Sequence, residues 1–374
     1  MASPNNNALI SHASPHTIKK FELIEAYIKT WVQKLLQNQS CRSIVFIDCM
    51  CNSGLYYSDD ENIVWGTPIR ISKILREAAG QYPSKKIYVY LNDFSQEKVD
   101  LLKENLPKEC RNFKYCITCR DANDMLREIG LKLPGQKQLH FFLFYDPYDA
   151  SINWDVLTPF FRSWGEILIN HVVNDSVRAI TQVKKQETKE KYEGTYRTSF
   201  ENLLPYGSKR EAYEKRIEEI IATLKGHRRR EYYVATFPFF NSRNSLVYDL
   251  IHCTGSEAGF KLFKATAWKT FGGKSSLKDT HGTENQLVLD FDGDGDITTH
   301  VDKTCYNIMD IVHYVHRRYQ GKSDIPFADI WALLDHHPIF PSDGYRNEIK
   351  AGLKEYYRDK ISRSTITFAS SGGI

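Results

Sequence analysis

The sequence lacks any apolar run near the roughly 20 residues that a membrane-spanning helix needs, although 41% of its 374 residues are hydrophobic. Its first segment, Met1–Ala13, is polar and contains none of the apolar core of a secretory signal. These two absences predict a cytoplasmic protein that has no membrane partner.

Metal-binding patterns are also scarce. Eight cysteines are scattered along the chain, and the CxxC pair of Cys116 and Cys119 has no second pair or matching histidines. We therefore expect reduced cysteines that pack as small apolar side chains. An acidic stretch that begins at Asp290 resembles a calcium loop, but its twelfth position, which requires a glutamate, is Val301. The sequence accordingly predicts no metal site.

An excess of charge of one sign is missing too, because 50 Lys and Arg residues against 46 Asp and Glu residues leave a formal net charge of +4. This balance neither requires nor excludes a nucleic-acid partner. The length exceeds that of one typical domain, so we expect a large core with an appended module.

Strand-like and helix-like segments alternate along most of the chain, which predicts βαβ units and a parallel sheet. A first helix is expected after Ala13, where Ser14 and Pro15 form a typical helix start. Two late strands, Tyr232–Phe240 and Leu246–Cys253, are expected to pair antiparallel. The predicted fold class is therefore α/β, a Rossmann-like and mostly parallel sheet with an antiparallel last strand. The other predicted strands are Ser43–Asp48, Lys86–Asn92, Phe113–Cys119, His140–Tyr145 and Glu166–Val173. The predicted helices between and after them are Pro68–Leu75, Gln96–Asn105, Asn123–Gly130, Trp154–Ser163 and Ser176–Gln186.

Four of the predicted strands run into a carboxylate. In a doubly wound sheet, ligands bind outside the carboxyl ends of the strands, where the strand order reverses. Acids at successive strand ends therefore converge on one crevice of the kind that binds a nucleotide, although aspartate is also common in ordinary turns. The four residues are Asp48, Asp93, Asp121 and Asp146.

The turn after the first strand, Asp48–Gly54, is rich in small residues, so its backbone amides can approach a cofactor. Asp93 is placed to accept hydrogen bonds from ribose hydroxyls, and Asp121 to lie near an adenine edge. The cofactor that these positions predict is S-adenosylmethionine (SAM). The predicted cofactor-binding residues are Asp48, Asn52, Gly54, Asp93 and Asp121.

The sharpest motif is Asp146-Pro147-Tyr148. Enzymes that methylate amino groups use an Asp-Pro-Pro-Tyr or similar run to hold the target nitrogen, on a base that is usually flipped out. Here the second proline is absent, and a plain turn after a buried strand is the alternative interpretation. We predict that Asp146, Pro147 and Tyr148 are the catalytic residues. Asn170 and His171, at the end of the fifth strand, could face the same cleft.

The end of the chain contains three helical segments and a β-prone stretch, which predict a winged helix. They are Asn307–Tyr319, Phe327–Leu334, Gly344–Arg358 and Ser362–Phe368. Cations recur at i, i+4 spacing in the third segment and continue into the predicted wing, which favours contact with phosphates. Because Glu348 and Glu355 lie nearby, a solvated helix face is the alternative. The six cations are Arg346, Lys350, Lys354, Arg358, Lys360 and Arg363.

Taken together, these stretches resemble the three-Cys-motif partner family of bacterial methyltransferase-like proteins, over most of residues 14–270. The motifs that carry the resemblance are His16–Lys20, Phe46–Asp48, Gly66–Pro68, Asp146–Tyr148, Asn241–Asn244, Tyr248–Ile251 and Ala267–Lys269. The resemblance implies a Rossmann-like methyltransferase fold, often followed by a winged-helix-like domain. In that family a glycine occupies the place of Asn52. A side chain there would obstruct the methionine moiety or alter which nucleotide fits.

The predicted organisation has three parts. Residues 14–275 form the methyltransferase-like domain, which includes a charged helical insertion at about 184–225. An acidic, glycine-rich linker over residues 276–304 leads to a winged-helix-like domain over residues 305–368.

Three functional hypotheses follow. The first is a SAM-dependent methyltransferase that acts on, or is bound to, DNA or RNA. The second is a catalytically degenerate methyltransferase fold that binds nucleic acid, or an operon-encoded protein partner, as a subunit of a defence or modification system. The third is an enzyme of another class that uses the same crevice for a different nucleotide. The methyl acceptor, the activity, the partner and the oligomeric state stay open at this level.

Overall fold

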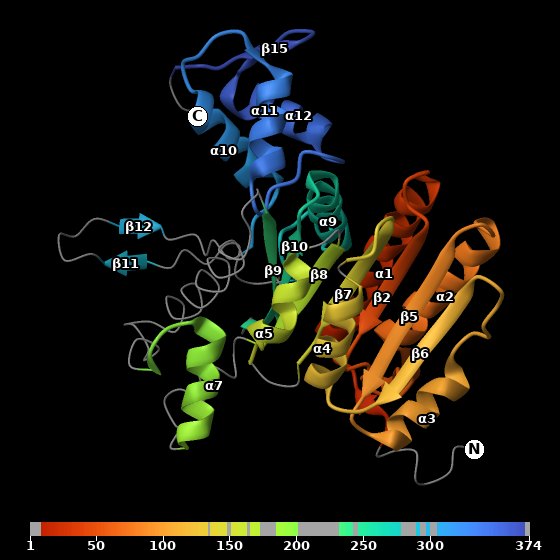
Figure 1. Cartoon of the computed structure of the whole chain (residues 1–374). Coiled ribbons are helices and arrows are strands. Elements are labelled where there is room, and N and C mark those ends of the chain that lie inside the picture. The colour runs from red at the N-terminus through yellow and green to blue at the C-terminus, as the bar shows by residue number, and fades with distance from the viewer. Residues whose placement is uncertain are drawn as a thin grey trace.

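The computed structural model describes residues 9–133, 135–147, 151–162, 165–172, 185–200, 232–241, 246–277, 289–291, 297–299 and 305–370. Its centre is a seven-stranded sheet in the order β6-β5-β2-β7-β8-β10-β9 (Figure 1). The strands are β2 (Ser43–Asp48), β5 (Lys86–Asp93), β6 (Phe113–Cys119), β7 (Leu139–Tyr145), β8 (Gly165–His171), β9 (Tyr233–Phe240) and β10 (Leu246–Thr254).

The sheet is mostly parallel. Strands β2, β5, β6, β7 and β8 pair in parallel with their neighbours, whereas β10 pairs antiparallel with both β8 and β9. The central strands β2 and β7 are buried along nearly their whole length, as expected for parallel strands that helices cover on both faces. The predicted α/β class, the mostly parallel sheet and the antiparallel pair β9–β10 are confirmed.

Helices cover both faces of the sheet (Figure 1). The apolar side chains of α1 (Pro15–Gln37), α2 (Thr67–Gln81), α3 (Gln96–Asn105) and α9 (Glu257–Thr270) join one buried cluster. Those of α4 (Ala122–Lys132), α5 (Trp154–Leu157) and α7 (Gln186–Tyr196) join a second cluster on the opposite face. None of the helices in the described ranges is long and apolar enough to cross a membrane.

The connection between β2 and α2 differs from the simple turn that the sequence predicts. It contains β3 (Leu55–Tyr57) and β4 (Ile63–Trp65), which pair antiparallel, while β1 (Ser11–His12) pairs with β3. These strands have only two or three residues each, so their sequences are too short to contain a recognisable alternating pattern. The helix predicted over Trp154–Ser163 is also shorter than expected, because α5 passes into a 3₁₀ helix, η2, over Thr158–Arg162.

Two predictions fall largely outside the described residues. Of the predicted helix Ser176–Gln186, the structure describes its last two residues, where α7 begins at Gln186. Of the predicted insertion at about 184–225, it describes residues 185–200, which contain α7. In the predicted linker, β11 (Leu289–Phe291) and β12 (Ile297–Thr299) pair antiparallel, where the sequence predicts only a loop.

Residues 305–370 form a further group of three helices and a small antiparallel sheet. Helix α10 (Ile308–Tyr319) begins at a capping box formed by Asn307 and Asp310. It is followed by β13 (Ile325–Pro326), α11 (Phe327–His336), α12 (Arg346–Tyr357), β14 (Lys360–Ile361) and β15 (Thr365–Thr367). We call this group the C-terminal module. It lies beside α9, at the β9 end of the sheet (Figure 1).

A buried lysine joins the module to the sheet domain. Lys264 of α9 is 1% exposed, and its ammonium donates to four backbone carbonyls at and after the end of α11. Those of Leu334 and Asp335 lie at 2.9 Å, and those of His337 and Phe340 at 2.7 and 3.2 Å. Burial lowers the pKa of Lys264 to about 7. Carbonyls at a helix C-terminus need such a partner, and they offset part of the cost of burying the charge.

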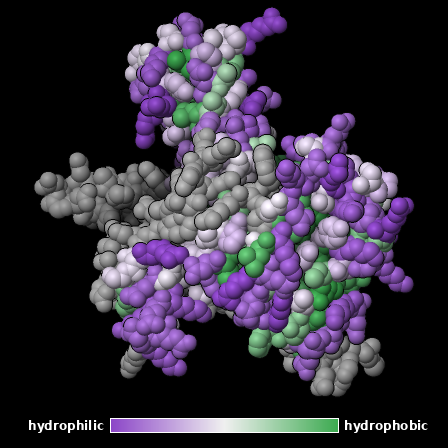
Figure 2. Space-filling view, viewed as in Figure 1, coloured by the Kyte–Doolittle hydropathy of each residue, from purple (hydrophilic) through white to green (hydrophobic). Residues whose placement is uncertain are grey.

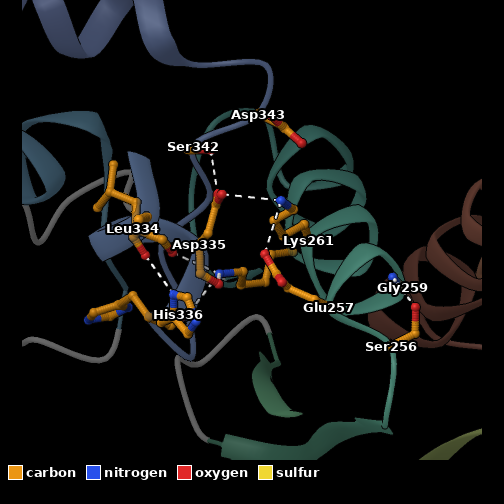
Figure 3. Close-up of polar contacts among 12 residues, drawn as sticks. Ser256, Glu257, Gly259, Lys261, Leu334, Asp335, His336, Ser342 and Asp343 are labelled. Atoms are coloured by element: carbon orange, nitrogen blue, oxygen red, sulfur yellow. Dashed lines mark hydrogen bonds and ion pairs between the residues drawn. The ribbon is translucent and has the colours of Figure 1, made fainter. Parts of the chain in front are cut away.

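A second, more exposed contact supports the same junction. Lys261, one turn earlier on α9, forms an ion pair with Asp335 at 3.2 Å, and Asp335 also accepts from the Ser342 hydroxyl at 2.6 Å (Figure 3). The Trp268 indole donates to the Ile339 carbonyl at 2.9 Å. Side chains of α9 thus hold the turn between α11 and α12.

Substitution of Lys264 tests this junction. We expect Lys264→Met to lower the free energy of unfolding by about 3 kcal/mol, because it leaves several buried carbonyls without a donor. Urea denaturation monitored by tryptophan fluorescence measures the loss. Lys269→Met, an exposed lysine on the same helix, is the matched control and should change stability by less than about 0.5 kcal/mol. Equal stability of the two variants would contradict the role of Lys264.

Candidate functional site

The strand order places a crevice at the carboxyl ends of β2 and β7. The chain adds β5 and β6 on one side of β2, and β7 and β8 on the other, so the order reverses between β2 and β7. Ligands of open α/β sheets bind at such a switch point. The structure has a cavity of about 250 Å³ there. Its lining residues, from the segments that follow β2, β5, β6 and β7, are Cys49, Met50, Asn92, Phe94, Arg120, Asp121, Ala122, Asn123, Tyr145, Pro147 and Ser151.

Phe94 is the most unusual lining residue. Its side chain is 80% exposed, although most of the visible surface of the protein is hydrophilic (Figure 2). It lies between Asp93 and Ser95, the residue whose side chain caps α3, so the backbone holds it at the mouth of the cavity. Sequence reasoning missed Phe94. The feature of the sequence that could have indicated it is an aromatic residue between an acid at a strand end and a helix-capping serine.

The first turn uses two left-handed residues. Asn52 has φ of +56° and Gly54 has φ of +72°. Asparagine tolerates this region better than most side chains, which explains how it stands where the resembled family has glycine. The Asn52 amide donates to the Ser11 hydroxyl at 3.0 Å and its oxygen accepts from the Ser53 amide at 2.8 Å. Asn52 is not one of the cavity-lining residues, so its side chain does not fill this cavity.

Gly54 is required by packing. A Cβ atom there would come within 2.8 Å of Leu102 and 2.9 Å of Ile69, in addition to the strain of its positive φ. Like Asn52, Gly54 does not line the cavity. Its observed role is to let the first turn press against α2 and α3.

Asp93 faces the protein backbone. Its carboxylate accepts from the backbone N–H of Asn52 at 2.8 Å and from the backbone N–H of Ser95 at 3.0 Å, and the residue is 2% exposed. Asp93 therefore ties the first turn to the start of α3. The neighbouring Asn92 lines the cavity in its place, with its amide donating to the carbonyls of Cys49 and Arg120.

Asp121 lies at the cavity and is exposed. One of its oxygens accepts from the backbone amides of Asn123 and Asp124, at 2.8 and 3.1 Å, which makes it the cap of α4. An aspartate cap with a free edge toward a cavity can accept a hydrogen bond from a ligand while still holding its helix.

Asp146 adjoins the cavity through Pro147, which lines it. One Asp146 oxygen accepts from the Lys20 ammonium at 2.9 Å and the other from the Asn170 amide at 2.5 Å. Tyr148, the third predicted catalytic residue, lies outside the described residues. His171 is fully buried, and its Nε2 lies 3.0 Å from the Tyr196 hydroxyl of α7. Of the two residues at the end of β8, Asn170 thus meets Asp146.

Asp48 is buried beside these groups. Burial, followed by the negative charges of Asp146 and Asp93, raises the pKa of Asp48 to about 8, even though the Met50 amide donates to it and Lys20 lies near. Asp48 is therefore mostly protonated at neutral pH. It does not line the cavity, and its observed role is at the base of the first turn.

The pH dependence of stability tests this assignment. Because the folded-state pKa of Asp48 lies above its unfolded value near 4, its contribution to stability is present below that value and is lost as pH rises through 8. Between these values the wild type should lose up to about 1.4 kcal/mol per pH unit relative to Asp48→Asn. Urea denaturation from pH 5 to 8.5 measures this. Asp60 is an exposed aspartate, so the curve of unfolding free energy against pH for Asp60→Asn should run parallel to that of the wild type. If the Asp48→Asn curve also ran parallel to the wild type, the assignment would be refuted.

The predicted row of six cations separates into two groups. The Arg346 guanidinium pairs with Asp343 at 2.9 Å and lies over the Trp331 ring. The Lys350 ammonium lies 3.9 Å from the centre of the Phe327 ring. The other four cations are exposed and form no ion pair with another described residue. They are Lys354, Arg358, Lys360 and Arg363.

The comparisons with known proteins yield no family assignment. No family model matches the chain, and no curated protein does. A structure from Legionella pneumophila is similar with a TM-score of 0.40 and 10% identity, over 67% of this chain and 92% of that one. Human methyltransferase-like protein 13, in complex with SAH, has a TM-score of 0.33 and 9% identity, over 72% and 99%. An O-methyltransferase from Bacillus cereus, also with SAH, has a TM-score of 0.32 and 11% identity, over 62% of this chain and 80% of that one. Such distant likeness leaves the function to this chain's own geometry.

Proposed function

We propose that this protein is a SAM-dependent methyltransferase that acts on nucleic acid. The observation that carries the proposal is the cavity at the switch point of the sheet, which combines apolar walls with hydrogen-bonding groups from four strand ends. This combination is typical of a site for a small ligand that has both an aromatic ring and hydroxyl groups.

The residues present fit the adenosine part of SAM. Phe94 offers an exposed ring on which a base can stack, and Ala122 and Pro147 add apolar surface to the lining. Asp121 supplies a carboxylate oxygen for hydroxyls or for the base edge, whereas the Asn92 side chain is already bonded to the Cys49 and Arg120 carbonyls and to the Thr118 hydroxyl. When bound, SAM supplies an activated methyl group. The protein's own task is to bind it, exclude water and hold the acceptor, for which Asp146 stands beside the cavity.

The C-terminal module supports a nucleic-acid acceptor. Its order of elements, helix, strand, two helices and two strands, is that of a winged helix, in which α12 would be the recognition helix and β14–β15 the wing. Lys354 and Arg358 at the end of α12, with Lys360 and Arg363 in the proposed wing, are exposed and can neutralise phosphates. The module lies beside α9 at the β9 end of the sheet (Figure 1). The cavity is lined from β2, β5, β6 and β7, in the other half of the sheet. An extended nucleic-acid strand could contact both the module and the cavity.

We further propose membership of the three-Cys-motif partner family, a cytoplasmic location and an operon-encoded protein partner. These proposals rest on the sequence motifs described above. His16 and Lys20 of the first motif lie at the start of α1, and Lys20 contacts Asp146, so part of the resemblance falls on the site itself.

Calorimetric titration with SAM tests the cofactor assignment. We expect micromolar binding by the wild type and at least about fivefold weaker binding by Phe94→Ala, because stacking on an aromatic ring contributes about 1–3 kcal/mol per base. Leu131→Ala removes another exposed apolar side chain, 86% exposed at the far end of α4, and should bind like the wild type. A well-folded wild type that binds no SAM would reject the proposal.

One observation favours a second candidate, a methyltransferase fold that binds nucleic acid or a partner without catalysis. The carboxylate of Asp93, predicted to hold a ribose, accepts from two backbone amides and does not line the cavity. In this case the site would have kept its architecture after losing its ligand. Failure to bind SAM, together with retained binding of nucleic acid, is the expected behaviour.

Nucleic-acid binding is tested by removing the four cations that form no ion pair with another described residue. Lys354→Gln/Arg358→Gln/Lys360→Gln/Arg363→Gln should weaken binding to a fluorescein-labelled 20-base-pair DNA duplex at least tenfold. It should also reduce the slope of log K against log salt by about 0.9 for each lost phosphate contact. Fluorescence anisotropy at several salt concentrations measures both. Arg346→Gln/Lys350→Gln, whose cations already contact Asp343 and the Phe327 ring, should have the smaller effect. Unchanged binding by the fourfold variant would assign these residues to a solvated surface.

A further inference from the structure

We propose that Lys20 is a positioning residue for Asp146, which it fixes beside the cavity as an ionised acceptor of hydrogen bonds. The inference deepens the proposed function and rests on it for the identity of the reaction. The positioning itself is a property of this chain that can be measured without a substrate.

The contact is built from two elements that are far apart in the sequence. Lys20 lies in the second turn of α1, and its ammonium is 2.9 Å from the Asp146 carboxylate at the end of β7. The Lys20 side chain is 8% exposed and the Asp146 side chain 25%. The buried end of the pair is therefore the cation, and the carboxylate is the more exposed end, next in the chain to the cavity-lining Pro147.

The surroundings keep Lys20 in place. Its ammonium lies 5.0 Å from the centre of the Tyr248 ring and 5.8 Å from that of Phe144, within reach of cation–π attraction. The Tyr248 hydroxyl donates to the His16 carbonyl at 2.8 Å, which attaches the first turn of α1 to β10. Lys20 cannot turn into water without disturbing these contacts.

The charge of Lys20 is needed because acids gather at this edge. The negative charges of Asp146 and Asp93 raise the pKa of Asp48, whereas the positive charge of Lys20 lowers it. The other titratable groups that interact with the pair are Cys49, Tyr248 and His16. Among these described groups, Lys20 is the lysine whose ammonium lies against the Asp146 carboxylate. Without Lys20, the Asp146 carboxylate would lie near Asp48 and Asp93 without the ammonium that now pairs with it.

The orientation of Asp146 points to the class of substrate. Lys20 holds one oxygen and the Asn170 amide the other, so the plane of the carboxylate is set from two sides. The side-chain oxygen of Asn170, Oδ1, is itself buried and accepts no hydrogen bond from another described residue. Asp146 and Asn170 together offer hydrogen-bond acceptors. A substrate group that donates, such as the exocyclic amino group of a nucleobase, matches them.

The first experiment measures charge without activity. Carbon-detected NMR follows the Asp48 carboxyl against pH in the wild type, Lys20→Met, Lys20→Arg and Lys19→Met, with Asp48→Asn assigning the resonance. We expect Lys20→Met to raise the titration midpoint of the Asp48 carboxyl by at least half a pH unit. Lys20→Arg should leave this midpoint unchanged. Lys19→Met is the matched control, since Lys19 is the adjacent lysine and pairs with Glu22, and it should have no effect. An unchanged midpoint in Lys20→Met would overturn the proposal.

Folding and activity provide the other readouts. If Lys20→Met does not fold, Lys20→Met/Asp146→Asn should, because removing the carboxylate removes the uncompensated charge. If both fail, Lys20 acts through packing alone and the proposal is wrong. Transfer of radiolabelled methyl groups to adenine- and cytosine-containing oligonucleotides is then measured. We expect at least a tenfold lower rate in Lys20→Met and recovery in Lys20→Arg. A shifted Asp48 midpoint with no methylation by the wild type would support the positioning and reject the proposed reaction.

Discussion

The carboxyl groups that meet at the ends of β2, β5 and β7 impose the constraint on which this region of the molecule depends. Like charges so close together, away from water, must each be compensated. The structure uses three different solutions. Asp48 is kept protonated by burial, Asp93 accepts from two backbone amides, and Asp146 pairs with Lys20 and Asn170. Each solution also does structural work, since it attaches the first turn, the start of α3 or the start of α1 to the sheet edge.

A related constraint governs the opposite end of the same helical layer. Helices α1 and α9 pack side by side, and each carries one buried lysine. Lys20 of α1 compensates carboxylates at the site, whereas Lys264 of α9 compensates the backbone carbonyls that end α11. The layer therefore connects the crevice of the sheet with the C-terminal module through rigid elements. The two parts form one continuous core, because apolar residues of the module join the cluster that contains α1 and α9.

Much of the fold could be predicted because the parallel strands are short, apolar and separated by amphipathic helices. The hairpin of β3 and β4 could not, since three-residue strands leave no period to detect. The spacing of Asp48, Asp93, Asp121 and Asp146 correctly indicated one edge of the sheet, because the carboxyl ends of parallel strands must meet there. It did not indicate which acids would face a ligand. Asp121 lines the cavity, while Asp93 turns toward the backbone.

Local pattern also does not show what a helix contacts in the folded chain. The i, i+4 spacing of the cations from Arg346 to Arg358 predicted one row, yet the first two lie against Asp343 and aromatic rings of α11. By itself, the sequence determined the order of strands and helices and the edge at which their acids gather, since periodicity and chain direction are local properties. Only the tertiary structure decided which acids are neutralised, which cations form no ion pair with another described residue, that Lys20 contacts Asp146 and that Phe94 lines the cavity. Those outcomes depend on contacts between segments that the chain brings together only when folded, such as the 126-residue separation between Lys20 and Asp146.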